Sequence, residues 1–526
     1  MKRSRMMDYL LRLTLFAFLL AACERPDPEV TILSTGGLTA VPPTLAAISF
    51  EQLGVAPPEA AAPIVPLAAT VVDAPTPTPD PPRYDPHSVG GQQTHTISPG
   101  DTLNYLGQFY GVSPEEIAAL NQIQLTDILY IGQQLLIPGQ ASQVGPSFKI
   151  IPDSELLFGP AAKGFYVRQT AVPHNGFLLR YSEEVEGKRL EGPEIVELVA
   201  HRHSVNPRLL LALLEYRSGW LTQPTLSESQ QKYPFGKSGA AYEGLYRQLS
   251  WAANELNWGY YGRAEGNLHT FALPDKTRIT FAPDINDATA GVQRMLGGAD
   301  TITFENWLHD AGPTGFFATY ERLFGNPFAL AIEPVWPSTL AQPTLQLPWA
   351  NGETWYFTGG PHGGWNSGSA WAALDFAPEA DVLGCFDSDA WVTAMSDGIV
   401  TRSGFGAVVV DLDGDRYAGT GWAIIYMHLA DRDRIPTGSP VQTGDRLGHP
   451  SCEGGFSDGT HVHIARTYNG RWVSADGDPT RGGVPFNMGG WVSQGVGREY
   501  DGFLIRGAVS KEACACREAS NAITWE

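Results

Sequence analysis

Five side chains of types that bind metal ions or transfer protons lie in the last third of the sequence. Two of them, His461 and His463, are separated by one valine in a stretch typical of a β-strand. Because alternate residues of a strand point to the same face, these two imidazoles share a face, about 6 to 7 Å apart along the chain. The other three are His362, Asp375 and His428.

Two imidazoles and one carboxylate form a catalytic zinc set that leaves the fourth coordination position open for water. A His-x-His pair alone is weak evidence, because most such pairs are surface or core histidines, but the three companions favour a zinc centre over five unrelated polar groups. Other zinc sites are less well supported. The chain has no His-Glu-x-x-His motif, and Cys514 and Cys516 are too close for a cysteine zinc site. His201 and His203 diverge around a predicted helix, which makes them a poor metal pair.

The candidate ligands fall within alternating apolar segments that follow a boundary at Pro337 to Pro348. Such segments predict the strands of an antiparallel sheet. They are Trp391–Met395, Gly398–Arg402, Ala407–Asp411 and Trp422–His428. Residues 341–526 are therefore expected to form a C-terminal, mainly antiparallel β domain that positions the five side chains.

This constellation resembles the lysostaphin and LytM type of zinc endopeptidase, which cuts peptidoglycan peptides, and most of all its beta-lytic, or staphylolysin, branch. A long Gly- and Ser-rich insert separates His362 from Asp375, and Cys452-Glu-Gly-Gly precedes the His-x-His pair, as in that branch. The resemblance extends from about Trp355 to Trp472.

The resemblance implies that His362, Asp375 and His463 bind Zn²⁺, and that His428 and His461 face the bound water and the scissile carbonyl. Zinc lowers the pKa of its water towards about 7, so this water is the expected nucleophile. A neutral histidine takes its proton and a second histidine stabilises the oxyanion. The sequence leaves open which of His428 and His461 has which role.

Four cysteines, an even number, lie in the same C-terminal region. In an exported chain such a set predicts disulfides. We expect a Cys385–Cys452 disulfide, although Cys385 lies upstream of the strand that carries the partner cysteine in the staphylolysin branch. Cys514 is expected either to bond to Cys516 or to form a separate crosslink.

The N-terminus carries the features of an export signal. Basic residues precede an apolar run, Leu10–Leu20, that is too short to span a bilayer. The run ends in Leu-Ala-Ala-Cys23, which resembles a bacterial lipobox and implies a lipid anchor on Cys23; ordinary cleavage near Ala22 is the alternative. Residues 1–22 are thus expected to be a lipoprotein signal peptide, and residues 23–90 a Pro-rich tether.

Residues 91–140 contain Gly-Asp-Thr-Leu, Gly-Val-Ser, Leu-Asn and Gly-Gln-x-Leu-x-Ile-Pro in this order. The segment resembles a LysM module, a βααβ fold that binds glycans containing N-acetylglucosamine. The resemblance implies a groove between two walls. The residues of the walls are Gly100, Asp101, Thr102 and Leu103 on one side and Ile128, Leu129 and Tyr130 on the other. The alternative for Asp101 and Thr102 is that they only cap the following helix.

Residues 150–340 are expected to be helical, with helices at Pro193–His203 and Pro207–Arg217. The motifs of this segment resemble the lysozyme-like fold of lytic transglycosylases. In that family a Glu that serves as the general acid immediately precedes the Ser at the helix end, whereas here Arg217 precedes Ser218. Glu215 lies about 200° around the helix and would point away from the cleft.

We therefore expect a degenerate middle domain that binds glycan but does not cleave it, because a guanidinium cannot replace a carboxylic acid. Four aromatic residues are candidates for stacking on sugar rings: Tyr246, Trp258, Tyr260 and Tyr261.

The charge of the chain excludes one class of partner. Its 526 residues include 35 Lys+Arg and 56 Asp+Glu, a formal charge of −21, which argues against a nucleic-acid binder. We expect an exported zinc metalloendopeptidase of the cell envelope that acts on peptidoglycan and contacts the membrane through the lipid on Cys23. One alternative is a non-catalytic wall-binding protein or amidase activator, which the intact zinc set disfavours. The other is a muramidase acting through the middle domain.

Overall fold

The computed structural model describes residues 93–97, 101–110, 112–138, 142–265, 270–337, 339–382, 384–477 and 483–526. The expected signal peptide, Cys23, the tether and Gly100 lie outside these residues. None of the helices among the described residues combines the length and the apolar character that crossing a membrane requires.

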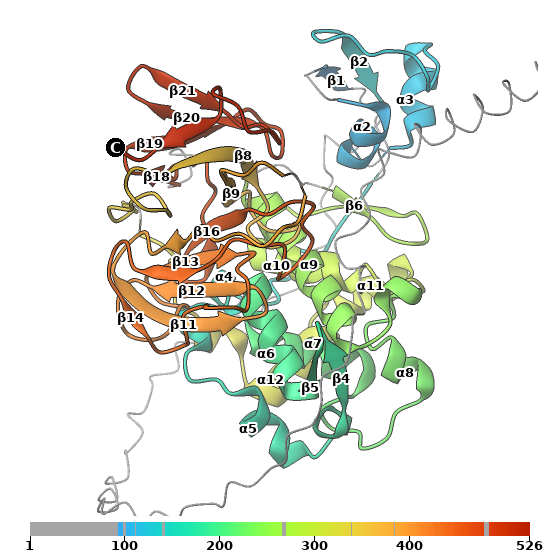
Figure 1. Cartoon of the computed structure of the whole chain (residues 1–526). Helices are drawn as coiled ribbons and strands as arrows, with labels where there is room; N and C mark the ends of the chain where they lie inside the picture. Colours follow the sequence, from blue (N-terminus) through green and yellow to red (C-terminus); the bar gives the residue numbers. More distant parts are fainter. Residues whose placement is uncertain are drawn as a thin grey trace, which may run out of the picture. The chain divides into compact units, whose positions relative to one another are not determined.

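The first described region has the βααβ order expected of a LysM module (Figure 1). Its elements are β1 (Gln93–Thr96), α2 (Leu103–Tyr110), α3 (Pro114–Asn121) and β2 (Gln134–Ile137), with β1 antiparallel to β2. Ser113 and Glu116 form a reciprocal capping box that starts α3. The buried side chains of Leu106, Ile117 and Leu135 close a small core of its own.

Residues 142–337 are mainly helical. The α-helices are α4 (Asp153–Leu156), α5 (Val167–Ala171), α6 (Gly192–His203), α7 (Pro207–Ser218), α8 (Glu228–Lys232), α9 (Leu245–Ala264), α10 (Asp287–Leu296), α11 (Phe304–Asp310) and α12 (Phe316–Phe324). The strands are β3 (Gln143–Val144), β6 (Thr270–Ala272) and β7 (Arg278–Thr280) in one small sheet, and β4 (Ser182–Val185) with β5 (Lys188–Glu191) in a hairpin. The two predicted helices are confirmed as α6 and α7 to within one residue at each end.

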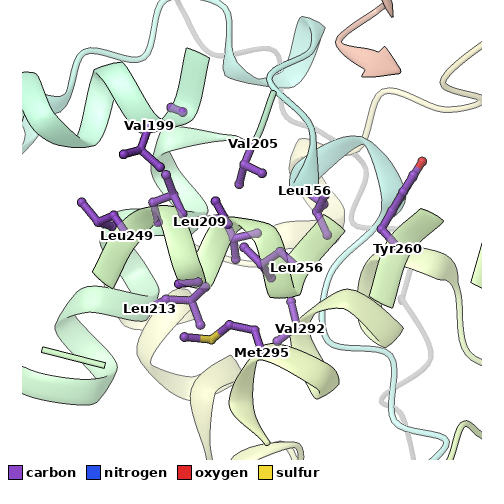
Figure 2. Packing of buried hydrophobic residues seen from close by; sticks show 14 of the residues in the cluster. Leu156, Val199, Val205, Leu209, Leu213, Leu249, Leu256, Tyr260, Val292 and Met295 are labelled. Carbon is purple, nitrogen blue, oxygen red and sulfur yellow. The ribbon is translucent and has the colours of Figure 1, made fainter. Parts of the chain in front are cut away.

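Local chemistry explains the bounds of α7. The side chain of Asn206 accepts a hydrogen bond from the backbone N–H of Arg208, Pro207 occupies the first turn, and Gly219 ends the helix at φ 69°. The apolar run 209–214 between these ends is buried on every side. Figure 2 shows Leu209 and Leu213 among side chains from α6, α9 and α10.

Residues 339–526 are mainly β, as predicted, and contain a nine-stranded antiparallel sheet in the order β14-β11-β12-β13-β16-β9-β8-β22, with β17 paired to β16. Its strands are β8 (Thr354–His362), β9 (Ala373–Pro378), β11 (Gly398–Gly404), β12 (Ala407–Asp411), β13 (Trp422–Met427), β14 (Pro440–Val441), β16 (Val462–Tyr468), β17 (Arg471–Trp472) and β22 (Ala522–Thr524). A smaller sheet consists of β18 (Asn487–Met488), β19 (Trp491–Gly495), β20 (Gly502–Arg506) and β21 (Val509–Glu512), and β10 (Val392–Thr393) pairs with β15 (Arg446–Gly448).

The large sheet is covered on both faces. Val408 and Val410 pack into a core made only by residues 345–523, whereas Ala407 and Val409 pack into the core of the helical region. Alternate side chains of β12 therefore point into two different cores, which explains why every residue of Ala407–Asp411 is buried.

Hydrogen bonds reinforce the contact between the helical region and the sheet. The backbone N–H of Trp472 donates to Tyr261 Oη at 2.9 Å, and its indole Nε1 donates to the carbonyl of His203 at 3.3 Å. Tyr260 and Tyr261 are only 1% and 3% exposed. The expectation that these two tyrosines stack on sugar rings is therefore wrong, because both rings are enclosed within the shared core.

We predict that the helical region and the large sheet unfold together. Trp472→Ala removes a buried indole from their contact and should lower the free energy of unfolding by about 3–5 kcal/mol. Tyr166→Ala, at a side chain that is 57% exposed, should change it by about 0.5 kcal/mol or less. Urea unfolding followed by circular dichroism at a helix and a sheet wavelength tests this. A shift of only one of the two signals in Trp472→Ala would contradict the prediction.

Candidate metal centre

Three adjacent strands bring the three predicted metal ligands together. His362 ends β8, Asp375 lies in β9 and His463 lies in β16. His463 is directly opposite Asp375 in the β16–β9 pair, so their side chains lie on the same face. A register shift in the β8–β9 pair, between Gly359 and His362, brings the third ligand to this point.

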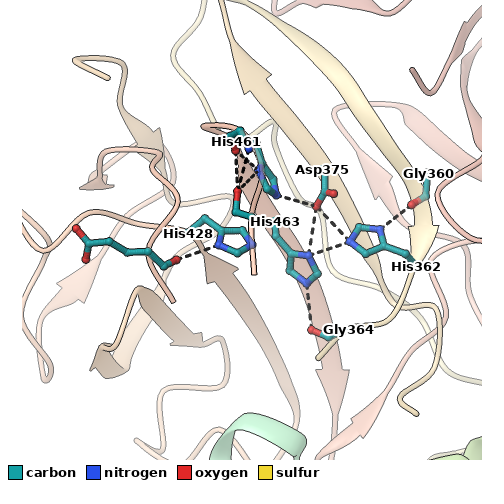
Figure 3. Close-up of polar contacts among 10 residues, drawn as sticks. Gly360, His362, Gly364, Asp375, His428, His461 and His463 are labelled. Atoms are coloured by element: carbon teal, nitrogen blue, oxygen red, sulfur yellow. Dashed lines mark hydrogen bonds and ion pairs between the residues drawn. The ribbon is translucent and has the colours of Figure 1, made fainter. Parts of the chain in front are cut away.

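The atoms of the three side chains meet at short distances (Figure 3). His362 Nε2 lies 2.9 Å from His463 Nδ1, and Asp375 Oδ1 lies 3.3 Å and 3.2 Å from these two nitrogens. All three side chains are buried.

Backbone carbonyls fix which ring nitrogens carry hydrogen. His362 Nδ1 is 2.8 Å from the carbonyl of Gly360, and His463 Nε2 is 3.1 Å from the carbonyl of Gly364. Because a carbonyl oxygen only accepts hydrogen bonds, both of these outer nitrogens donate. In the neutral rings the two inner nitrogens therefore direct lone pairs at each other, the arrangement that second-shell bonds give to metal ligands.

This arrangement fits a zinc ion. Two lone pairs and a carboxylate oxygen converge among buried side chains, and Asp375 Oδ1 accepts no hydrogen bond from any described residue. The separations are close to the edge of about 3.3 Å of a tetrahedron with bonds of about 2.0–2.1 Å.

The other two predicted histidines lie beside this centre. His428 follows β13 in a left-handed backbone conformation, φ 61°, and its Nδ1 donates to the carbonyl of Glu453 at 2.9 Å. Its ring centroid is 4.5 Å from that of His461, whose Nε2 is 3.7 Å from Asp375 Oδ1. Burial lowers the pKa of His428 well below its ordinary value, and His461 and His463 lower it further. His428 is therefore a neutral imidazole with its free lone pair on Nε2.

The structure contains the predicted Cys385–Cys452 disulfide, with the two Cα atoms 5.8 Å apart. It lies directly beside Glu453, whose carbonyl orients His428. The bond thus fixes the segment that sets the tautomer of this histidine. Cys514 is bonded to Cys516, one of the two outcomes that the sequence left open.

Sequence reasoning missed the groups that orient the ligands. The carbonyls of Gly360 and Gly364 are backbone atoms, so no residue type identifies them. The ring of Tyr500 stacks on that of His362, with centroids 4.2 Å apart. The nearby Gly359 was a usable signal of close packing around Asp375, because a Cβ at this position would lie 2.7 Å from Asp375 Oδ2.

The predicted glycan contacts of the LysM module differ in exposure. Thr102 Oγ1 accepts a hydrogen bond from the backbone N–H of Tyr105, the capping alternative, and Asp101 Oδ2 is 2.8 Å from His95 Nε2. Leu103 is 6% exposed and packs in the module's core, so the prediction that its side chain contacts the glycan is wrong. Leu129 also packs against this core.

On the second expected wall, Ile128 and Tyr130 are 76% and 70% exposed. These two are therefore the large exposed apolar side chains of the predicted set, in which Thr102 is exposed as well.

In the helical region the carboxylate of Glu215 is occupied. Its two oxygens accept hydrogen bonds from the backbone N–H groups of Leu221 and Thr222 and from the hydroxyl of Thr222. Arg217 pairs with Asp310 at 2.7 Å. Neither arrangement leaves an acid free to protonate a glycosidic oxygen.

Comparison with known proteins finds two matching domain families and several similar bacterial proteins. Residues 149–336 match the LasA N-terminal domain, and residues 95–138 match the LysM domain. Protease LasA of Pseudomonas aeruginosa is 28% identical over 337 residues, which cover 58% of this chain and 76% of that protein. The N-acetylmuramoyl-L-alanine amidase XlyA of Bacillus subtilis is 26% identical over 126 residues, 22% of this chain and 41% of that protein.

Two solved structures are also similar. The M23 metalloprotease pseudoalterin has 28% identity and a TM-score of 0.27, with 33% of this chain and 96% of that chain covered. The catalytic domain of lysostaphin from Staphylococcus simulans has 21% identity and a TM-score of 0.17, with coverage of 24% and 86%.

These findings confirm the predicted LysM module and show a LasA-like chain, in agreement with the predicted resemblance to zinc endopeptidases of the lysostaphin type. The lysozyme-like fold expected of residues 150–340 is not confirmed, because the match over 149–336 is to the LasA N-terminal domain instead.

We predict about one zinc ion per chain, bound by the three converging ligands. His463→Ala and Asp375→Ala should each reduce zinc to background, because two ligands do not hold the ion as three do. His461→Ala should retain zinc and serves as the matched control. Mass-spectrometric metal analysis of dialysed protein, with circular dichroism to verify folding, measures both. Stoichiometric zinc in folded His463→Ala would contradict the assignment.

Proposed function

We propose that this LasA-like chain is an exported zinc metalloendopeptidase that hydrolyses peptide bonds of peptidoglycan. The observation that carries the proposal is the buried convergence of two lone-pair nitrogens and one unbonded carboxylate oxygen beside two further imidazoles. The similarity to Protease LasA supports peptidase chemistry, and the LysM match supports a wall polymer as the partner.

His362, Asp375 and His463 would hold the zinc ion. When bound, it lowers the pKa of a water molecule and polarises the peptide carbonyl. The histidine beside it, His428, supplies the general base. Its Nδ1 donates to the Glu453 carbonyl, which leaves the Nε2 lone pair to accept the proton of the attacking water and pass it to the leaving amine.

His461 takes the complementary role. Its Nδ1 lies 2.7 Å from the carbonyl of Gly459 and therefore donates there, so Nε2 donates as well only when the ring carries both protons. The carboxylate of Asp375, 3.7 Å from Nε2, favours that protonated form. We assign it to donate a hydrogen bond to the oxyanion that develops on the scissile carbonyl.

The location and the substrate belong to the same proposal. The apolar run before Cys23 supports export and lipid attachment to a membrane. The staphylolysin-like insert between His362 and Asp375 supports cleavage next to glycine in peptide bridges. The muramidase alternative is not retained, because Glu215 is occupied by Leu221 and Thr222.

We predict that zinc-loaded protein releases new amino groups from purified peptidoglycan and that a zinc chelator abolishes this release. His428→Ala should keep its zinc and lower kcat by about 10²–10⁴-fold, because a general base contributes to turnover rather than to ligation. His309→Ala, at an exposed histidine, should retain full activity. Release of reducing ends in place of amino groups would show a muramidase instead.

We also predict that the LysM module binds the polymer independently of cleavage. In the His463→Ala background, which should leave the polymer intact, Tyr130→Ala should weaken binding to insoluble peptidoglycan several-fold, because about 1 kcal/mol of apolar contact is lost. The control is Tyr166→Ala, which alters a similarly exposed tyrosine outside the module. A sedimentation assay that gives equal binding for both variants would contradict the predicted groove.

A further inference from the structure

The β12–β13 hairpin carries three aspartates at alternate positions, Asp411, Asp413 and Asp415. One carboxylate oxygen from each lies within 4.8 Å of the others. The strands pair from Ala407 opposite Met427 to Asp411 opposite Ala423, so the cluster lies about 13 Å along the strands from the end that leads into His428. It is therefore separate from the zinc candidates.

One oxygen of this cluster is buried without a partner. Asp411 is 0% exposed, and its Oδ2 accepts a hydrogen bond from the backbone N–H of Arg416 at 2.9 Å. Its Oδ1 is buried and accepts no hydrogen bond from any described residue. A carboxylate oxygen in this position costs folding free energy unless a cation compensates it.

The neighbouring acids increase the need for a compensating cation. Burial and, after it, the charge of Asp413 together raise the pKa of Asp411 to about 6. The described ion pairs include one cation on the cluster, Lys163, whose Nζ is 2.5 Å from Asp415 Oδ2. One ammonium does not neutralise three carboxylates, and it does not contact the buried Asp411 oxygen.

The backbone holds the three carboxylates in place. Asp413 Oδ1 accepts from the N–H of Asp415 at 3.1 Å, and Asp415 Oδ1 accepts from the N–H of Tyr417 at 2.8 Å. Gly414 and Arg416 have φ values of 79° and 68°, which turn the chain back on itself. The site is thus preorganised by short-range contacts.

We propose that Asp411, Asp413 and Asp415 bind a Ca²⁺ ion. Calcium takes six to eight oxygen ligands at about 2.3–2.6 Å in flexible geometry, and aspartates at alternate positions of a tight loop are a recurring way to supply them. Asp413 and Asp415 are exposed, which leaves room for water ligands. Zinc prefers nitrogen and sulfur ligands, and Mg²⁺ requires a near-ideal octahedron.

A calcium ion here would also fasten the hairpin to the helical region. Besides the Lys163–Asp415 ion pair, Tyr417 Oη donates to the carbonyl of Gly159 at 3.0 Å, and the Tyr417 ring packs on Phe158 with centroids 5.2 Å apart. Ordering the loop therefore stabilises the contact with residues 158–163.

The test is calorimetric titration of CaCl₂ into the full zinc-loaded chain after passage over a chelating resin, with zinc content measured before and after. We expect one site with a Kd of about 10⁻³ M or tighter, a higher Tm in calcium and no change in zinc. Asp413→Asn, an exposed isosteric change, should weaken binding at least about tenfold, as should Asp411→Asn.

Two controls separate the site from its surroundings. Lys163→Ala removes the ion pair and leaves three carboxylates, so it should bind calcium at least as tightly as the unaltered chain. Asp389→Asn, at a side chain that is 99% exposed, should bind calcium normally. Absence of binding at 10-fold above the expected Kd, unchanged affinity in Asp413→Asn, or equal affinity for Mg²⁺ would overturn the proposal.

Discussion

The central constraint on this protein is the meeting of His362 Nε2, His463 Nδ1 and Asp375 Oδ1 among buried side chains. Backbone carbonyls hold the outer ring nitrogens as donors, so the inner nitrogens present lone pairs. Without a cation this cluster would repel itself. A fold that maintains it must supply rigidity from other contacts.

That rigidity comes from the position of the three predicted ligands in the middle of a wide antiparallel sheet. β16 and β9 are interior strands, and β8 is flanked by β9 and β22, so each ligand strand is hydrogen-bonded on both sides. Both faces of the sheet are packed, one against its own core and the other against the helical region. Trp472 lies in β17, which pairs with β16, the strand that carries His463. Its hydrogen bonds to Tyr261 and His203 extend this packing to the edge of that strand.

Features encoded by short-range patterns could be predicted from the sequence. The helix Pro207–Ser218 follows from its caps and apolar run, and the strand Ala407–Asp411 from its composition. The spacing of His461 and His463 indicated a shared face. Features that depend on long-range packing could not be predicted: the sequence does not show that Tyr261 contacts Trp472 of the sheet, 211 residues away. It also does not reveal which carbonyls orient the histidines.

The most direct test of the account is a crystal structure of the zinc-loaded chain with anomalous diffraction data collected at the zinc absorption edge. The account predicts one strong anomalous peak within coordination distance, about 2.0–2.2 Å, of His362 Nε2, His463 Nδ1 and Asp375 Oδ1, with His428 and His461 outside the first coordination sphere. A peak bound instead by His428 and His461, or no peak at this position in protein that contains zinc, would contradict it.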